Sequence, residues 1–238
     1  MYTNNKHKMQ GDAFMKRTKL RDRSLPHYSH GEERFNTISH IVGGGFGVIA
    51  LVACLWRATL NDNVWGIVGG AIYGGSMILL YTVSSVYHGL RHTMGKKVMQ
   101  IIDHCTIYLL IGGTYTPILF CSIRPVSPGW AWTLFGIVWG LAIMAATLTA
   151  IDLKKYAILS MACYIGMGWC IVIIFNELIQ INPVSLWLLL AGGICYTGGF
   201  IFYGIGKTKK WFHSIWHIFV LLGTICHFIS VIFLMINC

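Results

Sequence analysis

Residues 212–236 read FHSIWHIFVLLGTICHFISVIFLMI. This stretch contains no Lys, Arg, Asp or Glu, and it exceeds the roughly 20 residues that an α-helix needs to cross the hydrocarbon core of a bilayer. It is therefore predicted to be a transmembrane helix. It also begins with His213 and His217, which lie one helical turn apart, and polar side chains inside a membrane are costly unless they serve a site.

Six further apolar runs of similar length precede this stretch. Short polar segments separate them, and segments of this length predict turns between helices rather than separate domains. The sequence therefore predicts an all-α membrane protein, in which residues 35–236 form a bundle of seven transmembrane helices. The predicted helices cover residues 36–56, 64–90, 98–120, 130–150, 157–177, 184–205 and 212–236.

The composition of the whole chain agrees with this fold class. Hydrophobic residues make up 55% and charged residues 11% of the sequence, whereas a soluble domain carries roughly 25% charged residues. The net charge of +10 would favour a nucleic-acid partner if the basic residues formed one patch. They are instead spread over the N-terminal tail and alternate loops, so no nucleic-acid partner is expected.

The positions of Lys and Arg predict the orientation of the bundle. Sixteen of the 18 basic residues lie in the tail or in every second loop, and only Arg57 and Arg124 lie on the other side. Cytoplasmic loops are enriched in Lys and Arg. The N-terminus is therefore predicted to be cytoplasmic and the C-terminus extracytoplasmic, which requires an odd number of spans.

Residues 1–34 are polar and basic, and they lack an apolar run of the kind found in a cleavable signal. Such a segment buries too little apolar surface to fold alone. It is predicted to be a mostly disordered cytoplasmic tail.

Small residues inside the predicted helices carry two further expectations. Glycine pairs spaced four apart let helix backbones approach closely in lipid, and three such pairs are present, at 43/47, 70/74 and 136/140. The eight cysteines lie in or beside apolar runs and form no C-x-x-C pair. They are expected to act as small buried hydrophobic residues rather than as a disulfide framework.

Strongly polar side chains gather in four of the seven predicted helices. They lie near the helix ends predicted to face the cytoplasm, and at 1.5 Å per residue the main candidates fall within about 10 Å of one interface. Polar residues at one depth of a membrane indicate a buried functional site. These residues are Glu33, Asn36 and His40 around the start of the first helix, Ser84 and His88 in the second, Asp103 and His104 in the third, and His213 and His217 in the seventh.

Three of these histidines, His88, His213 and His217, are predicted to bind Zn²⁺. Two imidazoles one helical turn apart can ligate one ion, and a third from a facing helix leaves the fourth tetrahedral position open for water. Asp103 at the same depth could hold or deprotonate that water. Ser84 could hydrogen-bond to the water, to Asp103 or to a substrate carbonyl, so Asp103 and Ser84 are the candidate catalytic residues.

The other polar residues have alternative roles. Glu33 and Asn36 either cap the first helix or line the mouth of a cavity. His40 is either a partner of the metal ligands or a hydrogen-bonding residue between helices, and the latter role is favoured for His104. His227 lies about 15 Å beyond His217 along the same helix, too far to share an ion, and is expected to be a packing residue.

Four ordered motifs resemble the hemolysin III family, the bacterial branch of the progestin and adipoQ receptor superfamily. The resemblance covers residues 31–236. It implies a seven-helix bundle in the cell membrane, specifically a bacterial inner membrane, with zinc held by the three histidines, Asp103 on the zinc water and Ser84 in the same cavity. The motifs are GEERFNTISH at 31–40, Ser84-x-x-x-His88, Asp103-His104 and His213-x-x-x-His217.

Three functions are compatible with these features, and membrane lipids are the expected partners in the first two. The superfamily includes alkaline ceramidases, so the resemblance implies a zinc-dependent hydrolase of lipid amide or ester bonds. The second function is a lipid or membrane-state sensor with structural zinc, because the outer loops are too short to bind a protein ligand. The third, a pore-forming cytolysin, is less favoured because the outer half of the polar helices is apolar.

Overall fold

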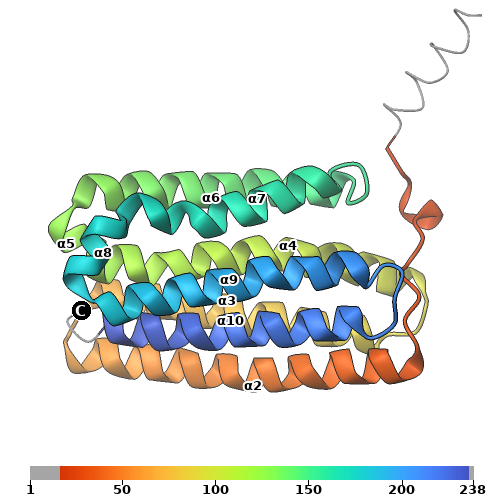
Figure 1. The fold of residues 1–238 in the computed structure, drawn as a ribbon, viewed down its shortest axis with the longest axis horizontal. Helices are drawn as coiled ribbons and strands as arrows, with labels where there is room; N and C mark the ends of the chain where they lie inside the picture. The colour runs from red at the N-terminus through yellow and green to blue at the C-terminus, as the bar shows by residue number, and fades with distance from the viewer. Residues whose placement is uncertain (1–16, 236–238) are drawn as a thin grey trace, which may run out of the picture.

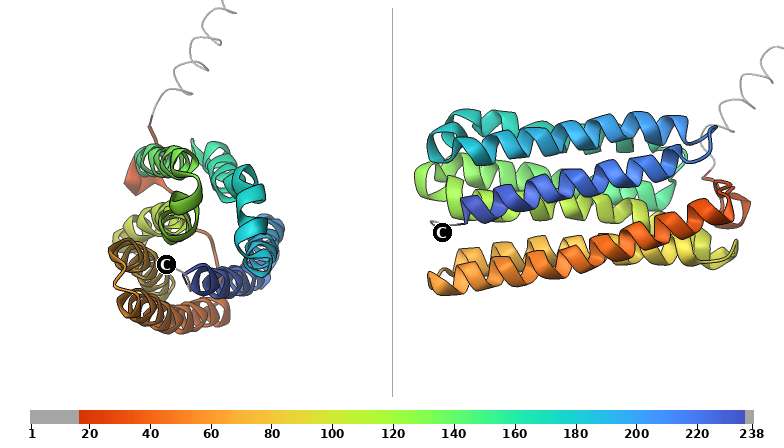
Figure 2. Two further views of the ribbon diagram at one scale, coloured as in Figure 1. Left: turned by 90° about the vertical axis from the view of Figure 1, so that its left-hand side faces the viewer. Right: turned by 60° about the horizontal axis from the view of Figure 1, so that its bottom comes forward.

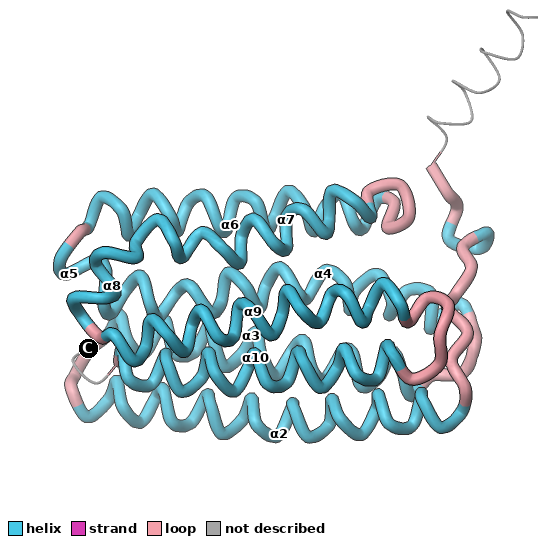
Figure 3. Tube along the Cα trace, in the orientation of Figure 1, coloured by secondary structure: helices cyan, strands magenta, loops and turns pink. Residues whose placement is uncertain are grey.

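The computed structural model describes residues 17–235, which form an all-helical bundle (Figures 1 and 3). Within these residues, seven helices are long and apolar enough to cross a membrane, and no strand is present. The predicted fold class is therefore confirmed. Residues 1–16 and 236–238 lie outside the described part of the chain.

Five spans consist of one helix each, whereas the third span runs through α4, η2 and α5 and the fifth through α7, η3 and α8. The elements in chain order are η1 (Leu20–Asp22), α2 (His30–Leu60), α3 (Val64–Gly89), α4 (Met94–Pro117), η2 (Ile118–Ile123), α5 (Arg124–Val126), α6 (Pro128–Ile151), α7 (Ala157–Trp169), η3 (Cys170–Ile174), α8 (Phe175–Ile181), α9 (Pro183–Ile205) and α10 (Phe212–Leu234).

Helices that follow one another in the chain pack side by side, and α10 returns to contact α2 (Figure 2, left). The span that begins with α4 is the most enclosed. Its most apolar stretch is 83% buried, compared with 28–56% for the other six spans. Helix α4 is therefore the element that can carry polar side chains into the interior without exposing them to lipid.

Helix α2 begins at His30, six residues before the predicted start. Ser29 and Glu32 form a capping box, in which the Ser29 N–H donates to the Glu32 carboxylate at 2.8 Å and the Glu32 N–H donates to Ser29 Oγ at 3.4 Å. This arrangement satisfies N–H groups that a helix start otherwise leaves unpaired. The added turns place Glu33 on a regular helix, facing the interior of the bundle.

Two of the three predicted glycine pairs bring helices together. The pairs on α2 and α3 lie where these two helices pack, and a Cβ added at Gly74 would overlap Leu51. The third pair does not contribute to packing, because no atom of another helix lies within 4 Å of a Cβ built at Gly136 or Gly140. Glycine spacing alone thus did not predict which helix faces meet.

The third span changes its winding after Pro117. This residue has no N–H, so it cannot donate the hydrogen bond of a regular α-helix, and the next six residues, Ile118–Ile123, form a π-helix. A regular helix had been predicted over residues 98–120. The span in fact continues to Val126.

The described part of the N-terminal segment, residues 17–29, lies against one end of the bundle. That end also carries the connections at 90–93, 152–156 and 206–211, and it is called the basic end below (Figure 1). The Arg17 and Arg23 guanidinium groups donate to the carbonyl of Ile151 at 2.8 and 3.0 Å. These residues belong to the predicted disordered tail 1–34, but they make specific contacts.

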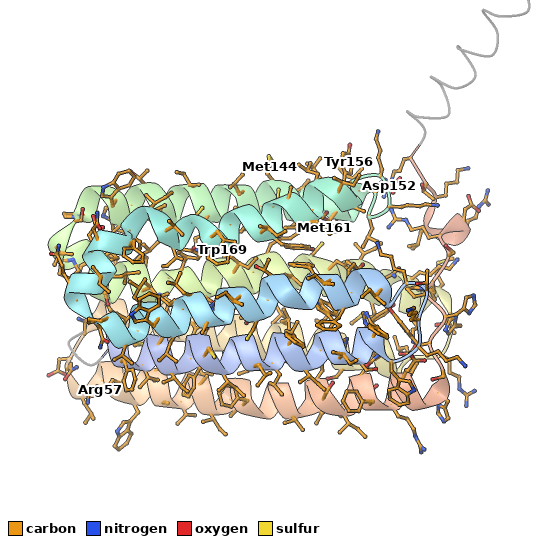
Figure 4. All side chains as sticks on the ribbon, viewed as in Figure 1. Arg57, Met144, Asp152, Tyr156, Met161 and Trp169 are labelled. Atoms are coloured by element: carbon orange, nitrogen blue, oxygen red, sulfur yellow. The ribbon has the colours of Figure 1, made fainter. Side chains whose placement is uncertain are left out.

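Asp152 fastens this segment at the basic end (Figure 4). Its carboxylate accepts hydrogen bonds from the N–H groups of Thr18 at 2.8 Å, Lys154 at 3.2 Å and Lys155 at 3.1 Å. Burial alone would raise the pKa of Asp152. The N–H groups of Thr18 and Lys155, together with the charge of Arg23, hold this pKa below its ordinary value.

One cysteine departs from the prediction. Cys121 in η2 is disulfide-bonded, so the expectation that the cysteines act only as small hydrophobic residues is wrong for this position. Cys238 lies outside the described residues. The free cysteines in the described part of the chain are Cys54, Cys105, Cys163, Cys170, Cys195 and Cys226.

Candidate metal centre

The three histidines predicted as ligands meet at the basic end of the bundle. His88 lies in the last turn of α3, and His213 and His217 lie in the first turns of α10. All three are buried, and one nitrogen of each lies within 4.8 Å of the corresponding nitrogens of the other two. The matching depths inferred from the sequence therefore correspond to a real cluster that could hold a metal ion.

The spacing of the nitrogens fits a tetrahedral ion. His213 Nε2 and His217 Nε2 lie 3.1 Å apart, and two nitrogens that bind one zinc at 2.0–2.1 Å in tetrahedral geometry are about 3.3 Å apart. Among the described residues, each of these two Nε2 atoms has a single hydrogen-bond partner, which is the other Nε2. Two imidazoles facing each other in this way need a proton or a cation between them.

Residues of α2 fix the positions of the elements that carry the histidines. The N–H of Trp211, which precedes α10 in a left-handed conformation with φ of 68°, donates to the Glu32 carboxylate at 2.6 Å. Ser214 Oγ donates to Asn36 Oδ1 at 2.8 Å. A non-glycine residue with positive φ is uncommon, and here it starts α10 two residues before His213.

Glu33 contacts the metal cluster directly. His88 Nδ1 donates to Glu33 Oε2 at 2.7 Å, and Lys96 Nζ lies 2.5 Å from Glu33 Oε1. Of the two roles left open for Glu33, the helix cap is wrong, because Glu32 makes the cap. Asn36 likewise does not cap the helix but is fully buried beside Ser214.

Asp103 and Ser84 lie together beside the cluster. Ser84 is close enough to interact with the Asp103 carboxylate, and both line one cavity together with His40. Asp103 does not belong to the set of mutually close ligand atoms formed by the three histidines. This position suits a residue that contacts a water or substrate rather than the ion itself.

His40 lies between the metal cluster and the cavity. Its ring centroid is 4.0 Å from that of His217, it is 4% exposed, and neither ring nitrogen has a hydrogen-bond partner among the described residues. A buried imidazole with both nitrogens unpaired is unusual in a folded protein. His40 is thus available to bind a polar atom inside the cavity.

The cavity has a volume of about 110 Å³ and runs between α4, α7, α9 and α10. Its lining is polar at the end near the metal cluster and mainly apolar beyond. On α4 it extends from Asp103 to Tyr115, which is about 18 Å at 1.5 Å per residue. The cavity is therefore mainly apolar along its length, with polar groups at the end nearest the metal cluster.

The other two histidines have structural contacts. His104 Nδ1 donates to the Gln100 carbonyl of its own helix at 2.8 Å, so the prediction of an interhelical hydrogen bond by this side chain is wrong. His227 Nε2 donates to the Leu189 carbonyl at 3.1 Å and packs on Tyr196. The prediction that His227 is a packing residue is confirmed.

Two site residues, Tyr28 and Lys96, were missed in the sequence. Tyr28 stacks on His213 with ring centroids 4.6 Å apart and covers the cluster from the basic end; burial raises the pKa of its hydroxyl. Lys96 had been counted as a loop charge. The only sequence signal for it is its place near the start of a predicted helix, two turns before Asp103.

Comparisons with known proteins agree with the motifs. Residues 28–228 match the family model described as Haemolysin-III related. The chain is 37% identical over 204 residues to Hemolysin-3 of Bacillus cereus, covering 85% of this chain and 91% of that protein. It is 38% identical over 203 residues to a Hemolysin-3 homolog of Bacillus subtilis (strain 168), covering 85% and 93%.

A more distant relative is the human monocyte to macrophage differentiation factor, which is 24% identical over 192 residues, 77% of each chain. The family model, the bacterial relatives and the seven apolar helices agree with the resemblance noted in the sequence. This chain therefore belongs to the Haemolysin-III related family of multi-pass membrane proteins.

Proposed function

We propose that this protein is a zinc-dependent hydrolase that cleaves an amide or ester bond in a membrane lipid. One observation carries the proposal: three buried histidines with facing nitrogens adjoin an apolar cavity, and Asp103 and Ser84 lie where the two meet. A cluster of this kind combines a metal site with a place for an acyl chain. Zinc would be held by His88, His213 and His217.

The charge bias supports an orientation for this site. The basic residues on one side of the predicted topology that fall in the described part of the chain, from Arg17 to Lys210, lie in the segments and connections at the end of the bundle that carries the histidines. Under the positive-inside rule that end faces the cytoplasm. The reaction would then take place in the cytoplasmic leaflet, where the carbonyl group of a lipid lies near the interface and its acyl chain extends into the hydrocarbon.

Bound zinc would supply a Lewis acid and lower the pKa of a water molecule toward 7. Asp103 would accept a proton from the attacking water and return it to the leaving nitrogen or oxygen. The C–N or C–O bond would then break, giving a fatty acid and an amine or alcohol. Ser84 would hydrogen-bond to Asp103 or to the carbonyl oxygen, where negative charge develops.

The remaining residues would position the lipid and limit access. The apolar part of the cavity would hold the acyl chain, and His40, with two unpaired nitrogens, would bind a polar atom near the scissile bond. Tyr28 covers the histidines at the basic end. The lipid would therefore enter from the side of the membrane rather than from the aqueous phase.

The test is turnover by purified protein with measured zinc content. It would be incubated in mixed micelles with a ceramide and with an ester lipid, and fatty-acid release would be followed by mass spectrometry. Asp103→Ala with zinc retained is expected to lower release by at least about 100-fold. Absence of release from both lipids by fully zinc-loaded wild-type protein would exclude the hydrolase.

A lipid sensor with structural zinc is the second candidate, favoured by the same cavity. It predicts saturable lipid binding that survives Asp103→Ala, without product. A pore-forming cytolysin, the third function considered for the sequence, is disfavoured because the part of the cavity beyond Asp103 is mainly apolar, whereas an ion path needs polar lining across the whole membrane. Conductance in a planar bilayer would reverse this ranking.

A further inference from the structure

Lys96 is a buried ammonium group that the proposed reaction does not use. It lies in the first turn of α4 and is only 1% exposed. A buried charge is retained in a folded protein only when it is paired and hydrogen-bonded. The contacts of Lys96 therefore show what this residue holds in place.

The three N–H groups of Lys96 each have an acceptor. Nζ donates to Glu33 Oε1 at 2.5 Å, to the Leu90 carbonyl at 3.0 Å and to the His88 carbonyl at 3.5 Å. The last two belong to the C-terminal end of α3, where unpaired carbonyls carry partial negative charge. Lys96 thus joins α2, the end of α3 and the start of α4 at one point.

The same contacts determine the orientation of His88. A carboxylate only accepts hydrogen bonds, so the 2.7 Å contact with Glu33 Oε2 makes Nδ1 the protonated nitrogen of His88. Nε2 is then the nitrogen with a free lone pair. A carboxylate behind a ligating histidine fixes its tautomer and ring orientation in metal sites generally.

We infer that Lys96 and Glu33 form an anchor that holds His88 in its metal-binding orientation, with Lys96 acting through Glu33. Lys96 fixes one carboxylate oxygen and the main chain of His88, and Glu33 presents its other oxygen to the imidazole. Lys96 is thus a positioning residue for the metal, not a catalytic one. The inference rests on the metal site of the proposed function but is independent of lipid hydrolysis.

The alternative is that Lys96 only fastens helix ends. Both roles predict lower thermal stability for Lys96→Met, but only the anchor predicts weaker zinc binding that depends on Glu33. The neighbouring Lys97 supplies a matched control. Among the described residues its side chain makes one hydrogen bond, to the Arg21 carbonyl at 2.6 Å, and this contact involves no residue of the metal cluster.

The experiment measures zinc affinity by chelator competition on full-length protein in detergent, for Glu33→Gln, Lys96→Met, the double variant and Lys97→Met. Glu33→Gln and Lys96→Met are each expected to weaken zinc binding by about 10–100-fold. The double variant should bind no more weakly than Glu33→Gln, because both substitutions break one network. Lys97→Met should bind like the wild type.

A Co²⁺-substituted sample provides a second readout, and Glu33→Asp provides a variant that keeps the charge paired with Lys96. The shorter side chain should withdraw from His88 and alter the visible ligand-field spectrum, even if Lys96→Met does not fold. Unchanged zinc affinity in Lys96→Met and an unchanged spectrum in Glu33→Asp would overturn the anchor. If the variants change zinc affinity and the Co²⁺ spectrum as expected but the wild-type protein hydrolyses no lipid, only the proposed hydrolase is excluded.

Discussion

Helix α10 carries histidines in two places, and their surroundings differ. His227 lines the cavity and has protein contacts: its Nε2 donates to the Leu189 carbonyl, and its ring packs on Gly192 and Tyr196. His213 and His217 instead face each other through nitrogens 3.1 Å apart. Both places put imidazoles on a membrane-spanning helix. What separates the packing residue from the candidate ligands is the partner of Nε2, which is a backbone carbonyl for His227 and another imidazole nitrogen for His213 and His217.

The comparison is tested most strongly by removing one histidine from each place. His217→Ala should reduce bound zinc from about one ion per chain to near zero, because it leaves only two imidazole ligands. His227→Ala should leave the zinc content unchanged. Metal analysis of detergent-purified protein would show this, and equal zinc loss in both variants would mean that the cluster does not bind the ion.

His227→Ala should instead destabilise the fold by about 2–3 kcal/mol. The substitution leaves the Leu189 carbonyl unpaired and opens a gap beside Tyr196. Thermal unfolding of the zinc-free protein would measure the loss. A variant as stable as the wild type would show that the hydrogen bond between α9 and α10 contributes nothing.

Gly192→Ala sharpens the comparison without touching a histidine. A Cβ at this position would overlap the His227 ring, and overpacking of this kind costs about 1–2 kcal/mol. Gly140→Ala is the control, since a Cβ there meets no atom of another helix within 4 Å, and it should be neutral or slightly stabilising. Equal thermal stability of the two variants would contradict the packing described for α9 and α10.

The smallest effect is expected at the basic end. Asp152→Asn should cost about 1 kcal/mol at pH 7 through weakened hydrogen bonds to the N-terminal segment. Because the folded pKa of Asp152 lies below its unfolded value of about 3.9, this stabilisation is present above pH 3.9 and disappears as the pH falls through the folded pKa. Melting curves from pH 7 to pH 3 should show wild type and variant converging.

The fold was predictable because each span is a local property of the chain. An apolar run longer than about 20 residues must form a helix in lipid to satisfy its own backbone, and all seven predicted spans are present. Their ends were less predictable. The start of α2 depends on the capping box of Ser29 and Glu32, and the winding after Pro117 depends on a missing N–H.

The site was predictable only in part. His88, His213 and His217 could be grouped because helical rise converts sequence position into depth in a membrane. Contacts between helices do not follow from depth. The His104 imidazole bonds to its own helix rather than to a neighbour. Of two adjacent carboxylates, Glu32 caps α2 while Glu33 contacts His88.

By itself, the sequence determined the seven helices, the sorting of basic residues to one side and the matching depth of the three histidines, because these depend on apolar length, charge and spacing along one chain. Only the tertiary structure decided that Lys96 joins Glu33 to His88 and that His40 faces a cavity with both nitrogens unpaired. The physical reason is that hydropathy fixes how deep a residue lies in the membrane but not how its helix is rotated about its own axis. The packing of α2, α3, α4 and α10 fixes that rotation and therefore the direction in which each side chain points.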